Sequence, residues 1–311
     1  MSQPVVVGPK PWLPRFLARW PSWTTPVRAE RLALLRIGVA AVLLLDILAN
    51  YLPHLGDLYG PNSLGESRIL WQDRPGTFWS LLGWVENPSV LHAAVLAWAA
   101  AAVLLLLGLC SRVSAAAAWA LSQSFLALNP YAHNAGDTVR TIILLYLVVA
   151  PCGAAWSLDR WLRRQRPAGP VFVYPWPLCL LLVQMAVIYF NNGVHKLIGP
   201  QWRAGSSLYY VLGDLTLTRW SYGELPLPFA VTQLLTWGVL VWELAFPLLV
   251  FLPSTRTATL LLGVLLHVGI GLSMELGVFA LYMLCLYLPF IPGRFSSAGF
   301  AAAPRAARTP R

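Results

Sequence analysis

The sequence has little charge. Asp, Glu, Lys and Arg make up 11% of its 311 residues, whereas 58% are hydrophobic and the mean hydropathy is +0.63. A soluble domain has about 25% charged residues, so this composition argues against a soluble globular enzyme. It also excludes a disordered chain, which combines low hydrophobicity with high charge. The remaining class is an all-α protein that crosses a membrane several times.

Paired cysteines and glycosylation motifs are also lacking. The four cysteines are scattered, without a Cys-x-x-Cys pair, so neither thiol redox chemistry nor a metal site is predicted. No Asn-x-Ser/Thr sequon with an allowed middle residue occurs. An internal repeat and a matching pair of interrupted helices are not visible either, which disfavours a transporter.

Long apolar windows predict a polytopic bundle of about eight spans. They lie at residues 32–52, 89–109, 113–131, 138–155, 175–195, 228–252, 257–274 and 277–291. Two long connections, 53–88 and 197–227, are rich in Trp, Tyr, Gly and Pro. They are too apolar for simple solvated linkers, so we expect them to fold over the outer mouth of the bundle.

The distribution of charge predicts the orientation. With eight spans and both termini cytoplasmic, most of the 22 Lys and Arg residues fall on the inner side and most acidic residues on the outer side. This is the positive-inside pattern. It accounts for the net charge of +10, so the lipid bilayer, and not nucleic acid, is the expected partner.

Three regions are expected along the chain. Residues 1–30 form a basic tail, either an amphipathic helix on the membrane surface or an irregular segment broken by prolines. Residues 31–292 form the transmembrane domain. Residues 293–311, rich in Ala, Pro and Arg, are expected to be disordered.

Three ionisable residues lie inside predicted spans. Asp46, Glu243 and His267 occupy three different helices, and such groups usually face a cavity or a partner. Each alone could be a hydrogen-bonded packing residue. Because they lie at broadly similar depth, we expect them to share one polar interior.

The outer end of the predicted span 175–195 is unusually polar. Lys196, one of only two lysines, follows Tyr189, Asn191, Asn192 and His195. A lysine at this boundary could simply extend its amine to water. Beneath an apolar loop it would instead lose its water, which favours the neutral amine that can act as a base.

The connection between the third and fourth predicted spans carries a second polar group. Asp137 can cap the following helix at its N-terminus, and Arg140 lies one turn further on. We expect Arg140 to pair with Asp137 or another acid. The same pair could bind an anionic or quinone oxygen, with His133 just upstream.

Four motifs, taken in chain order, carry a family resemblance. They are Gly136-Asp137 with Arg140; Gly193-Val194-His195-Lys196-Leu197 with Trp202 and Gly205; Trp237-Gly238 with Glu243; and His267 with Gly277 and Phe279. Over about residues 30–292 the chain resembles the membrane domain of vitamin K-dependent gamma-carboxylase, in the compact bacterial form called the HTTM (horizontally transferred transmembrane) domain.

The resemblance implies a function and a location. The lysine with which the carboxylase deprotonates vitamin K hydroquinone falls on Lys196, with His195 and Asp137 as further catalytic candidates. Tyr189, Asn191, Asn192, Arg140, Trp202 and His133 are then expected to bind a reduced quinone of the vitamin K or menaquinone type. The expected location is the inner membrane of a bacterium, and the expected substrate is a secreted protein or peptide.

Two departures limit this expectation. The carboxylase has a catalytic histidine where this chain has Gly136 or Asp137, and it continues into a large lumenal domain for which this sequence has no counterpart. We therefore expect a hydroquinone-oxidising core. The alternative is a non-catalytic module that binds lipid or quinone and assists the maturation or export of a secreted partner.

Overall fold

A computed structural model describes residues 26–60, 63, 80–82, 87–163, 169–220, 224 and 226–291. The predicted C-terminal tail 293–311 and residues 1–25 of the predicted N-terminal tail lie outside this range. Most of the predicted outer connection 53–88 lies outside it too.

All eight predicted segments are helical. They correspond to α1 (Glu30–Asp46) with the π-helical turn η2 (Ile47–Tyr51), α4 (Pro88–Leu107), α5 (Ser111–Leu128), α6 (Ala135–Val149), α8 (Trp176–Ile198), α11 (Phe229–Phe251), α12 (Arg256–Ser273), and α13 (Phe279–Cys285) with the 3-10 turn η4 (Leu288–Phe290). Short elements join them: β1 (Val27–Arg28), α2 (Leu55–Tyr59), η3 (Pro130–Ala132), α7 (Leu158–Leu162), β2 (Phe172–Val173), α9 (Pro200–Ala204) and α10 (Ser207–Gly213).

Five of these helices are long and apolar enough to cross a membrane. They are Glu30–Tyr51, Pro88–Leu107, Trp176–Ile198, Phe229–Phe251 and Arg256–Ser273. The other three helices are less apolar or shorter. Helix α5 contains several serines, α6 has only 15 residues, and α13 ends after 7 residues before the turn around Pro289. At 1.5 Å per residue, α6 is shorter than a hydrocarbon core of about 30 Å. The chain is thus a multi-pass helical protein, and eight spans remain a prediction.

Capping residues explain where the helices begin. Asn87 accepts a hydrogen bond from the backbone of Ser89 at the start of α4, with Pro88 in the first turn. At the start of α6, Asn134 and Asp137 form a reciprocal capping box. The prediction that Asp137 caps this helix is confirmed, with Asn134 as the N-cap residue itself.

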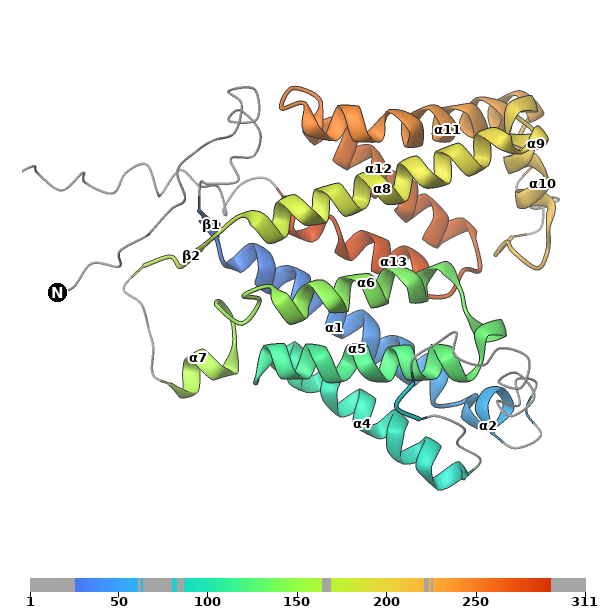
Figure 1. Cartoon of the computed structure of the whole chain (residues 1–311). Helices are drawn as coiled ribbons and strands as arrows, with labels where there is room; N and C mark the ends of the chain where they lie inside the picture. The colour runs from blue at the N-terminus through green and yellow to red at the C-terminus, as the bar shows by residue number, and fades with distance from the viewer. Residues whose placement is uncertain are drawn as a thin grey trace, which may run out of the picture.

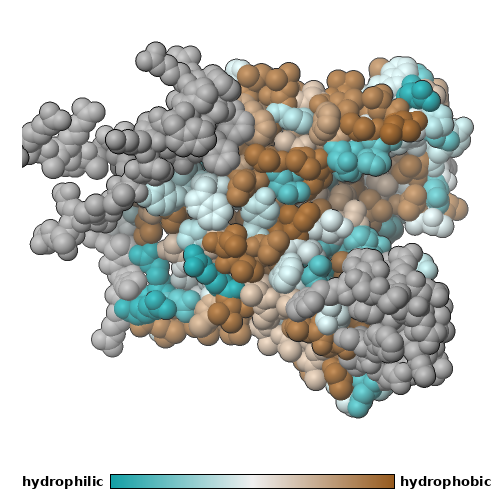
Figure 2. Space-filling view, in the orientation of Figure 1, coloured by the Kyte–Doolittle hydropathy of each residue, from teal (hydrophilic) through white to brown (hydrophobic). Residues whose placement is uncertain are grey.

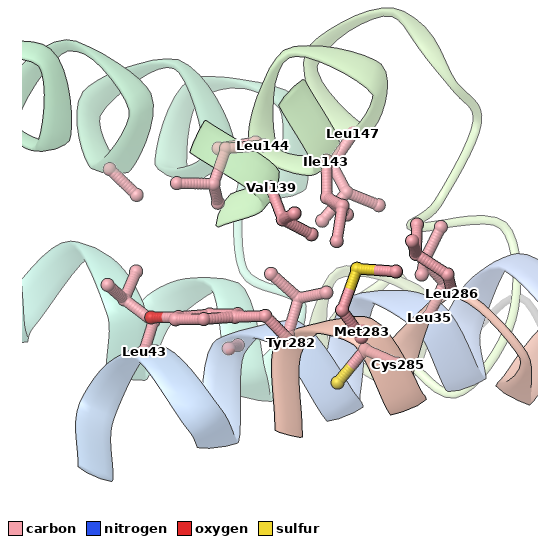
Figure 3. Close-up of a cluster of buried hydrophobic side chains, with 14 of the residues drawn as sticks. Leu35, Leu43, Val139, Ile143, Leu144, Leu147, Tyr282, Met283, Cys285 and Leu286 are labelled. Atoms are coloured by element: carbon pink, nitrogen blue, oxygen red, sulfur yellow. The ribbon is translucent and has the colours of Figure 1, made fainter. Parts of the chain in front are cut away.

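The long helices run alongside one another (Figure 1), and chain neighbours pack in pairs: α1 with α4, α4 with α5, α5 with α6, and α8 with α11. Near its C-terminal end the chain comes back to its first helices, where α13 packs against both α6 and α1. Figure 3 shows this junction, where Leu43, Ile143 and Met283 come from the three helices and are buried together. It forms the central part of the apolar core.

The two ends of the bundle differ. The short helices α2, α9 and α10 lie at one end, and α7 and the β1–β2 ribbon lie at the other (Figure 1). The ribbon is antiparallel, with Val27 opposite Val173. Thus the described part of both predicted outer connections lies at one end, and the basic residues Arg28 and Arg160 lie at the other.

Large apolar side chains also cover the outside of the helices. Leu96 is 59% exposed, Val241 64% and Leu265 66%, and hydrophobic residues occupy much of the visible face in Figure 2. In the most apolar stretch of α12 only 22% of the residues are buried inside the protein. Surfaces of this kind are stable against lipid and not against water, so these helices contact the membrane.

Candidate functional site

The C-terminal part of α8 and the middle of α11 place a lysine against a glutamate. Lys196 Nζ donates a hydrogen bond to Glu243 Oε1 at 2.5 Å. The Lys196 side chain is 25% exposed, but that of Glu243 only 5%. The second carboxylate oxygen, Oε2, is buried and has no hydrogen-bond partner among the residues that the structure describes.

A glycine allows the two helices to come this close. A Cβ atom at Gly193 would lie 3.0 Å from side-chain atoms of Leu244 and 3.1 Å from its backbone nitrogen. Any larger residue would push α8 away from α11, because backbone cannot move aside as a flexible side chain can. Gly193 thus permits the close approach of α8 and α11 beside Lys196 and Glu243.

The following helix, α9, covers the lysine. The ring of Trp202 lies 4.7 Å from Lys196 Nζ, in cation–π geometry. Two side chains of α11 fix α9 in place, since Trp237 donates to the carbonyl of Arg203 at 3.1 Å and Gln233 to that of Ala204 at 3.1 Å. The Lys196 ammonium therefore lies between a carboxylate and an indole ring.

These groups line a large cavity of about 1080 Å³. Its walls come from α6, α8, α11, α12 and α13, and from the connection that includes α9 and α10. Most lining residues are leucine, valine, isoleucine or aromatic; the polar exceptions include Tyr189, Asn191, Asn192, Lys196, Glu243 and His267. A mainly apolar cavity with a few convergent polar groups is the usual form of a small-molecule site.

A hydrogen-bonded chain of three side chains lies along the cavity wall. The Tyr189 hydroxyl is 2.8 Å from His267 Nε2 and also contacts the hydroxyl of Tyr287. Tyr189 and His267 line the cavity. The other imidazole nitrogen, Nδ1 of His267, is buried and has no hydrogen-bond partner in the described part of the chain.

A second charged cluster lies elsewhere in the bundle. Arg140 is fully buried, and its Nη1 contacts Asp46 at 2.9 Å and Asp137 at 2.8 Å. Tyr51 and Tyr282 complete the cluster through hydrogen bonds to Asp137 and Asp46 respectively. It joins α1, α6 and α13, which makes it a structural link between three helices.

Comparison with known proteins identifies the family. A sequence model of the HTTM domain matches residues 25–293, nearly the whole of the described bundle. The chain belongs to the HTTM domain family. It is also 25% identical over 199 residues to the uncharacterized protein YitO of Bacillus subtilis, a match that covers 60% of this chain and 63% of YitO. The chain thus spans less than two thirds of that relative. No solved structure matches it.

Seven of the residues predicted for the HTTM site line the cavity together: Tyr189, Asn191, Asn192, Lys196, Trp202, Glu243 and His267. Four others do not. Asp137 and Arg140 are ion-paired with each other in the buried cluster. This confirms the prediction that Arg140 pairs with an acidic residue. His133 and His195 are exposed, next to Thr138 Oγ1 at 3.0 Å and to the carbonyl of Asn191 at 2.8 Å.

The expectation of one shared polar interior is corrected. Glu243 and His267 line the cavity, but Asp46 belongs to the separate cluster around Arg140. The reason is that Arg140 provides Asp46 with an opposite charge on a neighbouring helix. Tyr287 was not predicted as part of the site. Its hydroxyl contacts that of Tyr189, which is 98 residues away in the sequence.

Proposed function

We propose that this protein is a membrane enzyme that binds a reduced quinone of the menaquinone or vitamin K type and removes a proton from it with Lys196. One observation supports this most strongly. A lysine and a buried glutamate meet on the wall of a large apolar cavity in a helical membrane protein. A prenylated ring needs such apolar space, and its hydroxyl needs a nearby base.

The polar atoms of the cavity fit a hydroquinone. The Lys196 side chain is 25% exposed on the cavity wall, so its amine can reach a ligand hydroxyl. The side-chain amides of Asn191 and Asn192 offer both donors and acceptors on the same wall. When bound, a hydroquinone would supply an acidic hydroxyl and the reducing equivalents.

The Lys196–Glu243 pair can then hold and move protons. Glu243 takes a proton from the Lys196 ammonium, which leaves a neutral amine at Nζ. That amine accepts the proton of the bound hydroxyl, and the resulting ammonium remains beside the oxygen that has become negative. Trp202 and the apolar wall leave only part of the Lys196 side chain exposed to water, which strengthens this attraction.

The proposal extends to orientation. Both termini are cytoplasmic, the cavity opens near the outer face of a bacterial inner membrane, and the substrate acted on there is a secreted protein or peptide. The basic residues of β1 and α7, at the end opposite α9 and α10, support this orientation.

A second function has one observation in its favour. Lys196 Nζ already has a carboxylate and an indole ring as partners, and such contacts can serve only to hold α8 against α11 and α9. The protein would then bind lipid or quinone without chemistry and assist the maturation or export of a secreted partner.

Turnover by purified protein in lipid nanodiscs separates the two functions. A prenylated naphthohydroquinone is supplied with oxygen, and its oxidation is followed by ultraviolet absorbance. We expect Lys196→Ala to slow oxidation by about 100-fold or more, the usual contribution of a general base. The control is Arg203→Ala, which removes an exposed cation of α9 that does not line the cavity.

Equal rates for the unsubstituted protein and Lys196→Ala would overturn the proposal. Tight binding of the hydroquinone without any oxidation would instead support the non-catalytic function.

A further inference from the structure

The cavity beside Lys196 is open along the edge between α11 and α12. Six residues of these two helices both line the cavity and are exposed: Leu234, Leu235, Gly238, Leu262, Leu265 and Gly269. Leu234 is 67% exposed and Leu265 66%, so this edge is not closed by protein. Both helices are long and apolar enough to cross a membrane, and the edge between them therefore faces lipid.

Two glycines lie at the same level of this edge. Helices α11 and α12 form an antiparallel hairpin, in which Gly238 lies 13 residues before the end of α11 at Phe251, and Gly269 lies 13 residues after the start of α12 at Arg256. Both are thus about 20 Å from the hairpin turn. A Cβ atom at either glycine would have no atom within 4 Å. Among the residues that the structure describes, no side chain fills the gap at this level.

The gap lies close to the charged pair. Gly238 and Glu243 are five residues apart on α11, which is about 7 Å along the helix axis. Both residues line the cavity, as does Lys196 on α8. A ring held beside Lys196 therefore has the gap between α11 and α12 next to it.

A second exposed edge of the cavity is more polar. It lies between α6 and α8, and its exposed lining residues are Ala135, Thr138, Asn191 and Asn192. An apolar chain that covered these amides and this hydroxyl would remove their water without replacing its hydrogen bonds, which is unfavourable. The leucines and glycines of the edge between α11 and α12 carry no such cost, so an apolar chain is favoured there.

We infer that the gap between α11 and α12 binds the apolar tail of the ligand whose ring meets Lys196. The tail passes between Gly238 and Gly269 and continues along the exposed leucines into the bilayer. The ligand class is a polar ring that carries one linear prenyl or alkyl chain. The inference rests on the proposed function for the ring, but it concerns the binding of the tail alone.

Binding without turnover tests this inference. The probes are two 1,4-naphthohydroquinones, one with a single prenyl unit and one with four, added without oxygen to the protein in nanodiscs. The short probe is tritiated, and each unlabelled probe competes with it. We expect both probes to bind the unsubstituted protein with similar affinity, because the long tail exchanges lipid for another apolar surface.

Substitutions that fill the gap should act on the long probe only. In Gly238→Phe and in Gly269→Phe, the long probe should bind about tenfold more weakly, the cost of forcing a bulky group into filled space, while the short probe binds as before. The matched controls are Val241→Phe and Val268→Phe, exposed positions of α11 and α12 that do not line the cavity. Thr138→Phe narrows the edge between α6 and α8 instead and should leave the two probes equal. Thermal unfolding of each variant checks that it is folded.

Equal binding of the two probes by folded Gly238→Phe and Gly269→Phe would overturn the inference, and would leave the gap to an acyl chain of the surrounding lipid. Selective loss of the long probe in Thr138→Phe would overturn it too, because the tail would then leave between α6 and α8. The expected pattern without any oxidation would support the inference and overturn the catalytic function. Absence of binding of both probes to the unsubstituted protein would overturn both.

Discussion

Two buried charge clusters use similar side chains in opposite ways. In the cluster around Arg140, two carboxylates and two tyrosines surround one guanidinium, and the Trp98 ring lies 5.0 Å from it. In the cluster around Lys196, one carboxylate and one indole ring contact the amine beside a large cavity. A charged cluster that is buried on all sides joins helices, whereas a charged pair on the wall of a cavity can meet a ligand.

Removing the central arginine should have the largest effect on stability. Arg140→Met leaves Asp46 and Asp137 buried without their cation, which costs about 3–5 kcal/mol. Thermal or denaturant unfolding in detergent measures the loss. The control is Arg219→Met, whose pair with Glu275 is 3.0 Å long but exposed and is worth about 0–1 kcal/mol. Equal losses in the two variants would show that the Arg140 cluster is not a structural link.

A smaller loss is expected where α8 meets α11. Gly193→Ala places a methyl group against Leu244 and should cost about 1–3 kcal/mol, while it weakens hydroquinone oxidation by separating Lys196 from Glu243. Gly238→Ala on α11 is the control for stability, because its Cβ would meet no atom within 4 Å. Unchanged stability and activity in Gly193→Ala would contradict the close approach of the two helices.

The indole ring over the lysine should contribute less. Trp202→Leu removes the cation–π contact at Lys196, worth about 0.5–2 kcal/mol, and hydroquinone binding measured by equilibrium titration should weaken accordingly. Trp161→Leu, a change at an exposed ring on α7, serves as the comparison. If both variants bind equally well, Trp202 does not cover the site.

The smallest effect concerns a charge in water, outside both clusters. Thr216 donates to the Asp214 carboxylate from its backbone nitrogen and its hydroxyl, and these hydrogen bonds lower the pKa of Asp214. A carboxyl whose pKa is lowered on folding stabilises the turn above its unfolded pKa and loses this contribution as the pH falls through the folded value. Amide hydrogen exchange at residues 214–218 should therefore become faster, after correction for intrinsic rates, as the pH is lowered below about 4. Asp214→Asn should remove this pH dependence.

Local features were predictable from the sequence. The eight apolar windows are all helical, and most ends agree within a few residues, because an apolar run and its capping residues act over short distances. Lys196 was recognisable as a cation on the predicted outer side of the membrane, where lysine and arginine are less frequent. The family resemblance was confirmed over residues 25–293.

The partners of the charged residues were not predictable in the same way. Asp46, Glu243 and His267 were expected together, yet Asp46 pairs with Arg140 on α6 and Glu243 with Lys196 on α8. Each contact joins residues at least 47 positions apart. Whether such groups meet depends on which helix faces pack, and periodicity within one helix does not carry that information.

The sequence by itself therefore determined the class of protein, the positions of its helices and the few charges that need explanation, since composition and apolar runs are local properties of the chain. Only the tertiary structure decided which of those charges became a structural link and which line a cavity. The reason is that a buried ion is stabilised by the partner nearest in space, and the packing of α8 against α11 and of α13 against α1 and α6 sets that partner.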